Sequence, residues 1–289
     1  MQWTTSRFTI DLTVPRVMGI VNVTPDSFSD GGQHASPHAA LQHCERLLAE
    51  GADMLDIGGE STRPGAVPLS SDDELKRVLP VVREAVRLGV PVSVDTYKPS
   101  VMQAVLDLGV DIINDVWALR WTETGQPGAV ASAPQVVARH ARCGICLMHM
   151  HREPQTMQVE PMTGDVVPQV KLFLAQVTHQ LQMQGVDMHR LVVDPGIGFG
   201  KTVAQNFSLL QRQAELLSLG FPVLAGWSRK SSLAAMVGHA SNKASVSGTE
   251  RMVPSVAAAL LAVERGASIV RVHDVRETVQ ALKVLQAIK

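Results

Sequence analysis

The sequence predicts one α/β domain, residues 1–289, built as a closed (β/α)8 barrel (a TIM barrel), and three observations support this prediction. Short β-rich segments alternate eight times with longer segments of helical period. Several of the β-rich segments are continuously apolar, which is typical of parallel strands that helices cover on both sides. No linker or change in composition divides the 289 residues, and such barrels commonly place about 250 residues in one domain. A doubly wound open sheet is the alternative architecture.

The eight units follow one another along the whole chain. Strands are expected at Val17–Val21, Met54–Ile57, Val92–Val94, Ile112–Ile113, Ile145–Met148, Leu191–Val193, Val223–Ala225 and Ile269–Val272. Helices are expected at His38–Ala49, Asp72–Arg87, Val101–Leu108, Pro134–Arg142, Val166–Gln184, Gln205–Leu219, Ser255–Arg265 and Glu277–Ile288. Most of these helices are followed by a glycine, which can adopt the left-handed conformation that ends a helix. Trp121–Gly128 is interpreted as a loop insertion, and Val237–Thr249 as a long connection.

The composition excludes several classes of protein. Lys and Arg number 26 against 27 Asp and Glu, so there is no electrostatic reason to expect nucleic acid or an anionic membrane as a partner. Three cysteines do not form a fully paired disulfide framework, which favours a reducing compartment. Met1–Leu12 lacks the pattern of a secretory signal, and no apolar run reaches the roughly 20 residues that span a bilayer. We therefore expect a cytoplasmic protein with no membrane partner.

Polar side chains follow the predicted strands at one end only. They lie at Asn22–Gly32, Gly58–Gly65, Asp95–Lys98, Asn114–Asp115, His149, Asp194–Lys201, Gly226–Ser231 and His273–Asp274, with Arg271 near the end of the last strand. The connections at the opposite ends, such as Glu50–Ala52 and Leu219–Pro222, are plain turns. In a barrel the carboxyl ends of all strands converge on one mouth, where active sites are built. The sequence therefore predicts a site at this mouth.

Two groups of residues at the predicted mouth indicate what it binds. Asp95, Asn114 and Asp194 suit a planar heterocycle that displays several hydrogen-bond donors and acceptors. The alternative for each of them singly is to cap the following helix. Lys230, Arg271 and His273 come from the last two strand ends, which adjoin Asn22 when the barrel closes. Such cations suit a diphosphate, and the Asn22 amide oxygen suits the Mg²⁺ that bridges diphosphate oxygens.

The first two loops, Asn22–Gly32 and Gly58–Gly65, are rich in Gly, Pro, Ser and Thr and exceed a minimal connection of about 2–6 residues. We interpret them as flaps that fold over the mouth and exclude water, delivering Thr62 and Arg63 to an anion on closure. Ordinary surface loops are the alternative.

Three short motifs are poor matches to the sites they suggest. Gly196–Thr202 lacks the first glycine of a P-loop and the last glycine of the dinucleotide fingerprint. Cys143 and Cys146 have the thioredoxin spacing but precede a strand instead of opening a helix. His149 and His151 resemble a zinc pair of barrel hydrolases, yet the other strand ends offer mainly Asn, Asp, Lys and Arg.

With these residues assembled, the sequence resembles the dihydropteroate synthase family over about Arg16–Val275. The resemblance rests on MGIVNVTPDSFSDGG (Met18–Gly32) and DIGGESTRPGA (Asp56–Ala66), followed in the family's order by VDTYK, INDV, LMHM, DPGIGFGK, WSRKS and RVHDV. It implies the condensation of 6-hydroxymethyl-7,8-dihydropterin diphosphate with p-aminobenzoate to 7,8-dihydropteroate and diphosphate. It also implies Mg²⁺ as cofactor, sulfonamides as inhibitors and a homodimer.

The resemblance also implies residue roles. Pterin-binding residues would be Asp95, Asn114, Met148, Asp194, Phe199, Lys230 and Arg271. The diphosphate would be bound by Asn22, Thr62, Arg63, Arg271 and His273, with Asn22 as the metal ligand. The p-aminobenzoate pocket would be formed by Thr24, Pro25, Ser27, Phe28, Arg63, Pro64 and Ser231. The catalytic set would be Asn22, Arg63, Asp95, Lys230, Arg271 and His273.

These roles fit an SN1-like reaction, because the carbon–oxygen bond that breaks leaves a delocalised pterin cation and a departing diphosphate. The arylamine is already neutral at pH 7 and needs no strong base. Two alternatives remain open, a pterin-binding methyltransferase domain and a non-catalytic pterin-binding paralogue. The Trp121–Gly128 insertion and the His151–Arg152 pair differ from the family pattern.

Overall fold

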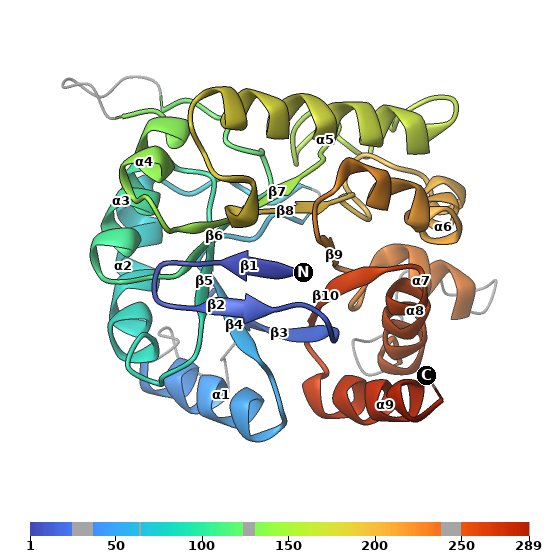
Figure 1. The fold of residues 1–289 in the computed structure, drawn as a ribbon, viewed down its shortest axis with the longest axis horizontal. Coiled ribbons are helices and arrows are strands. Elements are labelled where there is room, and N and C mark those ends of the chain that lie inside the picture. Colours follow the sequence, from blue (N-terminus) through green and yellow to red (C-terminus); the bar gives the residue numbers. More distant parts are fainter. Residues whose placement is uncertain (25–36, 64, 124–130, 238–249, 289) are drawn as a thin grey trace.

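The computed structural model of the chain is described for residues 1–24, 37–63, 65–123, 131–237 and 250–288. Eight parallel strands close into a barrel in the order β10-β3-β4-β5-β6-β7-β8-β9, and helices surround them (Figure 1). The predicted (β/α)8 barrel is confirmed, and the open-sheet alternative is wrong. No helix in the described ranges is both long and apolar enough to cross a membrane.

The barrel strands are β3 (Arg16–Asn22), β4 (Met54–Gly58), β5 (Val92–Asp95), β6 (Ile112–Asp115), β7 (Gly144–Met148), β8 (Leu191–Asp194), β9 (Val223–Ala225) and β10 (Ala267–Val272). The helices are α1 (Pro37–Ala49), α2 (Ser71–Ala85), α3 (Pro99–Asp107), α4 (Ala133–Arg139), α5 (Val166–Met183), α6 (Val203–Gln211), α7 (Ser231–Val237), α8 (Met252–Glu264) and α9 (Val275–Ala287). The described residues also form two 3-10 helices, Met188–Arg190 and Gln213–Leu219.

The segment predicted as one helix over Gln205–Leu219 is instead α6 followed by the second 3-10 helix. Helix α6 begins earlier because Thr202 and Gln205 form a reciprocal capping box. It ends where the Gln213 side chain donates to the carbonyl of Ala262, 2.8 Å away on α8. This contact with α8 fixes the segment after α6, and local sequence does not reveal it.

A hairpin that the sequence analysis did not predict closes the amino-terminal end of the barrel. Strands β1 (Gln2–Thr4) and β2 (Thr9–Asp11) pair antiparallel and lie across the ring of barrel strands (Figure 1). Trp3 is fully buried, and its indole N–H donates to the carbonyl of Arg190 at 2.9 Å. Strands of three residues show too little alternation to be recognised from sequence.

The barrel interior is apolar at this end and polar at the mouth. Below the mouth, one buried side chain from most of the barrel strands packs with the hairpin: Met18, Met54, Ile112, Cys146, Val192, Leu224 and Ile269. Nearer the carboxyl ends of the strands several buried side chains are charged or amide groups, among them Asp56, Asn114 and Asp194. The apolar layer therefore lies beneath the polar side chains of the mouth.

Candidate active site

Strand register brings the predicted polar residues into one row. Asn22 on β3 lies opposite Gly58 on β4, Gly58 opposite Asp95 on β5, and Asp95 opposite Asn114 on β6. A Cβ on Gly58 would lie 3.6 Å from the Cβ of Asp95 and 4.0 Å from Oδ1 of Asn22. The two side chains thus face each other across a position that carries no side chain.

Arg271 joins this row from β10, the strand that pairs with β3 on the side away from β4. Its Nε donates to Oδ2 of Asp56 at 2.6 Å, and its Nη2 donates to Oδ2 of Asp95 at 2.9 Å. The Asn114 amide also donates to Oδ2 of Asp56, at 3.1 Å. Oδ1 of Asp56 is buried and has no hydrogen-bond partner among the described residues. One guanidinium therefore organises two carboxylates and an amide.

The sequence analysis assigned no role to Asp56, which is fully buried. It lies inside the predicted strand Met54–Ile57, whereas most of the predicted site residues follow a strand. An acidic residue inside an otherwise apolar strand was the available signal, since buried carboxylates are rare unless they are paired.

The electrostatics of this network follow from burial and pairing. Burial raises the pKa of Asp95 to about 7, against the opposing effect of Arg271. Burial alone would lower the pKa of Arg271, but Asp56 and Asp95 outweigh it and raise that pKa. Arg271 therefore stays charged at the floor of the mouth.

A second group comes from the ends of β7, β8 and β9. Burial raises the pKa of Asp194, although its Oδ1 accepts the backbone N–H of Gly196 at 2.7 Å. Lys230 lies with its Nζ 4.3 Å from the centre of the Phe199 ring. Burial lowers the pKa of Lys230 to about 8, while Asp194 acts in the opposite direction. Met148 is buried in register with Asp194.

The glycine-rich turn after β8 is held by a buried lysine. Gly196 has φ +69°, and a Cβ there would lie 1.8 Å from the carbonyl oxygen of His149. Lys201 Nζ donates to Nδ1 of His149 at 2.9 Å, to the Gly196 carbonyl at 2.8 Å and to the Phe199 carbonyl at 3.1 Å. Lys201 thus faces the protein interior, and its bonds fix the turn that presents Phe199.

Two further motifs were considered in the sequence, the possible zinc pair His149 and His151 and the thioredoxin-spaced pair Cys143 and Cys146. Burial and Lys201 lower the pKa of His149 to about 2, so its ring is neutral and bound to Lys201. Among the described residues, no group of three or more His, Cys, Asp and Glu side chains could hold a metal ion. Cys143 and Cys146 are free and buried, and burial raises the pKa of Cys143 to about 12.

The predicted anion-binding residues lie at the same mouth. Burial, with Arg229, Arg271 and Arg63 in decreasing order, lowers the pKa of His273 to about 3. Arg63 is exposed on the second loop, Thr62 is partly buried beside it, and Ser231 begins α7. Pro25, Ser27, Phe28 and Pro64 lie outside the described residues, and Thr24 is the last described residue before that segment.

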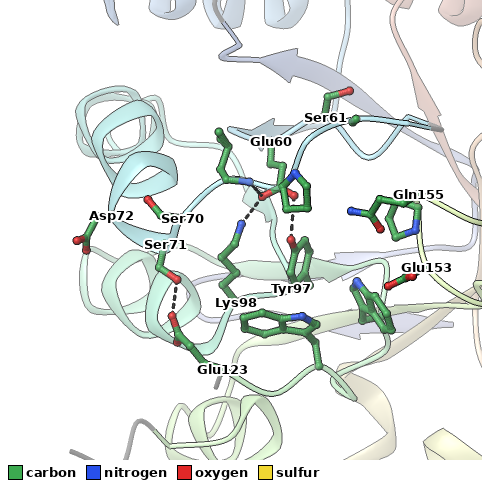
Figure 2. A pocket seen from close by; sticks show the side chains of 16 residues that line it. Glu60, Ser61, Ser70, Ser71, Asp72, Tyr97, Lys98, Glu123, Glu153 and Gln155 are labelled. Atoms are coloured by element: carbon green, nitrogen blue, oxygen red, sulfur yellow. Dashed lines mark hydrogen bonds and ion pairs between the residues drawn. The ribbon is translucent and has the colours of Figure 1, made fainter. Parts of the chain in front are cut away.

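The root of the second loop is anchored by a buried charge network, which the sequence analysis missed (Figure 2). Lys98, 2 % exposed, donates to Glu60 and to Glu74, the latter at 2.5 Å. The Tyr97 hydroxyl donates to Glu60 at 2.8 Å. Burial raises the pKa of Glu74 despite Lys98. Glu60 precedes Thr62 and Arg63, so these contacts fix the point from which the loop leaves the barrel.

Glu60, Tyr97 and Lys98 also border a cavity of about 340 Å³ outside the predicted substrate residues. Trp121, the first residue of the predicted insertion, lines it and packs edge-on against Tyr97, with ring centres 5.1 Å apart. The rest of the insertion beyond Glu123 lies outside the described residues. Arg152, noted for departing from the family pattern, forms an ion pair with Glu160.

Comparisons with known proteins agree with this geometry. The model of the pterin binding enzyme family matches residues 18–273. Dihydropteroate synthase of Neisseria meningitidis serogroup B is 47% identical, over 99% of this chain and 97% of the relative. Dihydropteroate synthase of Escherichia coli K12 is 44% identical, over 96% of this chain and 93% of the relative.

Solved structures give the same result. Yersinia pestis dihydropteroate synthase in a sulfonamide drug complex superposes with a TM-score of 0.88 and 40% identity, covering 100% of this chain and 99% of that one. The Burkholderia cenocepacia enzyme complexed with 7,8-dihydropteroate gives 0.84 and 48%, covering 99% and 96%. The predicted enzyme class, a transferase, is confirmed by these relatives. The chain belongs to the dihydropteroate synthase family of pterin binding enzymes.

Proposed function

We propose that this chain condenses 6-hydroxymethyl-7,8-dihydropterin diphosphate with p-aminobenzoate, giving 7,8-dihydropteroate and diphosphate. The observation that carries the proposal is the Arg271 network, in which one cation holds Asp56 and Asp95 at the floor of a mouth that also contains Asp194, Lys230 and His273. The solved relative that holds 7,8-dihydropteroate supports it.

We assign the edge of the pterin ring to the polar side chains at the bottom of the barrel mouth. Asp95, Asn114 and Asp194 offer oxygen acceptors to ring N–H groups, and Lys230 offers a donor. Met148, Phe199 and Arg271 are assigned to the ring faces, since a planar heterocycle packs against flat or polarisable side chains. When such a ligand binds, its N–H groups give the buried carboxylates the hydrogen bonds that they lost from water on burial.

The diphosphate is assigned to Asn22, Thr62, Arg63, Arg271 and His273, which carry the cations and neutral donors of the mouth. Of this set, Asn22 supplies one oxygen that could bind Mg²⁺. Since Mg²⁺ usually takes its remaining ligands from substrate phosphates and water, the site fits the ion only when the diphosphate is also bound. When bound, Mg²⁺ would take up negative charge that develops on the leaving diphosphate. Asn22 would hold the ion through Oδ1.

The p-aminobenzoate pocket is assigned to Thr24, Pro25, Ser27, Phe28, Arg63, Pro64 and Ser231. The relative of Xanthomonas albilineans that holds 4-aminobenzoic acid, 48% identical to this chain, supports a pocket for the same class of ligand here. We also propose that sulfonamides compete for this pocket, as the Yersinia pestis complex suggests.

The reaction is assigned an SN1-like course. The bond that breaks joins the exocyclic carbon to the diphosphate oxygen, and the electron pair leaves with the diphosphate. Ionised Asp95 and Asp194 would stabilise the pterin cation, and Arg271 with His273 would stabilise the leaving anion. The neutral arylamine then attacks the carbon, and its proton passes to the diphosphate, the base that the reaction itself releases. The two loops would exclude water, which would otherwise capture the cation.

A coupled diphosphate-release assay tests the proposal. Release is expected to require both the pterin diphosphate and p-aminobenzoate, and to stop when Mg²⁺ is chelated. A steady-state rate of release that p-aminobenzoate does not increase would contradict it. Pterin binding without turnover would favour the non-catalytic paralogue, and methyl transfer from a pterin would favour the methyltransferase domain.

We further propose a cytoplasmic homodimer, as the family resemblance implies. Light scattering after size-exclusion chromatography is expected to give about twice the 31.1 kDa chain mass. A monomer at micromolar concentration would overturn this assignment.

A further inference from the structure

Two consecutive residues after β9 bind two consecutive residues after β10. Oγ of Ser228 lies 2.9 Å from Nδ1 of His273. Arg229 Nη2 donates to Oδ1 of Asp274 at 2.6 Å, and its Nε donates to Oδ2 at 3.2 Å. Arg229 has φ +57°, a left-handed conformation that is uncommon outside glycine and is retained only where surrounding contacts enforce it. The turn is therefore built to hold these two strand ends together.

The hydrogen-bonding capacity of Ser228 decides where the His273 proton lies. Oγ of Ser228 already accepts the backbone N–H of His273 at 3.1 Å. A hydroxyl has one proton to donate, and Ser228 is 8 % exposed, so that proton needs an acceptor inside the protein. Nδ1 of His273 is the acceptor that the described residues provide. If Nδ1 carried the ring proton instead, the serine proton would have no acceptor among the residues that the structure describes.

The position of that proton determines what His273 can do. Burial lowers its pKa most, and the neighbouring cations Arg229, Arg271, Arg63 and Lys230 lower it further, so the imidazole of the free protein is neutral and has a single N–H. Nε2 makes no hydrogen bond to the described part of the chain, so it is the nitrogen left for a ligand. An N–H there donates to an anion, whereas a lone pair there repels one.

We propose that Ser228 is a positioning residue that fixes His273 as the Nε2–H tautomer, so that the ring donates to an oxygen of the diphosphate. This inference rests on the proposed function and deepens it. Ser228 does not touch the substrate in this assignment, since it acts through His273.

The first test reads the tautomer directly in the substrate-free protein. In nitrogen-15 spectra of the histidine side chains, with His273 assigned by comparison with His273→Gln, Nδ1 is expected as the unprotonated nitrogen and Nε2 as the protonated one. Ser228→Ala is expected to mix the two tautomers. A protonated Nδ1 in the native protein would overturn the proposal.

The second test measures the affinity for inorganic diphosphate with Mg²⁺ by calorimetry. Ser228→Ala is expected to weaken binding about tenfold, the scale of one hydrogen bond to a charged group. In a His273→Gln background, Ser228→Ala is expected to change nothing further, because its effect passes through the imidazole. An equal loss in both backgrounds would overturn the proposal.

Two further variants separate positioning from loosening of the turn. Ser255 also holds this turn, since its Oγ accepts the backbone N–H of Arg229 at 2.9 Å, yet it does not touch His273. Ser255→Ala is expected to leave the His273 tautomer unchanged, and Ser228→Thr, which keeps the hydroxyl, is expected to retain it. A tautomer that shifts in Ser255→Ala would contradict the assignment.

Failure of this inference is distinguishable from failure of the proposed function. The tautomer is read without substrate, whereas turnover is read by diphosphate release. A native enzyme that turns over with Nδ1 protonated overturns the role of Ser228 alone.

Discussion

Nε of Arg271 lies 2.6 Å from Oδ2 of Asp56, although the two residues are 215 positions apart in the chain. The contact joins the last barrel strand to the second and crosses the interior below the mouth. Asp56 is fully buried, and the same carboxylate accepts the Asn114 amide. Asp56 therefore sets the orientation of both an assigned anion-binding cation and an assigned pterin-binding amide.

Replacing Asp56 by Asn is expected to lower the free energy of unfolding by about 3 kcal/mol, because it leaves the Arg271 guanidinium with a weakened partner in a buried site. Urea unfolding measures the change. Asp53→Asn is the control, since Asp53 pairs with Arg16 at 3.1 Å and is 31 % exposed, so its loss is expected within about 1 kcal/mol. Equal losses in the two variants would argue against a central role for Asp56.

Replacing Asp95 by Asn is expected to reduce kcat/KM by at least about 100-fold, because the carboxylate is the group assigned to stabilise the developing pterin cation. The Arg271 contact survives, since an amide oxygen still accepts. Steady-state kinetics with both substrates give the answer. Undiminished turnover in Asp95→Asn would contradict the SN1-like course.

Replacing Lys201 by Met is expected to lower the free energy of unfolding by about 2–4 kcal/mol, because two carbonyls and the His149 ring lose their donor. The variant is also expected to change the pH dependence. Burial lowers the pKa of Lys201 from 10.5 to about 7. Between these values the unfolded chain binds a proton that the folded chain has released, so stability rises with pH.

Denaturant titrations from pH 7 to 10 test the Lys201 prediction. The native chain is expected to gain stability across this range, and Lys201→Met is expected to gain less. Lys283→Met is the control, because Lys283 is exposed on α9. Should Lys201→Met show the same pH slope as the native chain, the buried amine would not be the group that titrates.

Replacing Tyr97 by Phe is expected to raise the KM for p-aminobenzoate several-fold with a smaller change in kcat. The hydroxyl that holds Glu60 at 2.8 Å is lost, and Glu60 is the root of the loop that carries Thr62 and Arg63. Stability should fall by about 1 kcal/mol. Ser100→Ala is the control, since Ser100 donates to Glu123 on the same cavity wall without contacting Glu60. If the KM for p-aminobenzoate were unchanged in Tyr97→Phe, the contact between Tyr97 and Glu60 would have no part in positioning the loop.

Much of the architecture followed from local patterns. Continuously apolar strands such as Leu191–Val193, separated by helical segments, predicted the barrel. Glycines that follow the helical segments placed most boundaries to within a few residues. The candidate site followed from one geometric rule: residues just after parallel strands meet at one mouth. That rule explains why Asn22, Asp95 and Asn114 share one row in the structure.

Tertiary structure decided the rest. Asp56, Lys98, Lys201 and Ser228 owe their roles to partners on other strands or loops, and Trp3 to the Arg190 carbonyl 187 residues away. Periodicity and capping act over a few residues, so the sequence by itself determined the order of the βα units and the chemistry at each strand end. The pairing of buried hydrogen-bond donors with their acceptors depends on closure of the barrel, because only closure brings distant side chains within hydrogen-bonding distance.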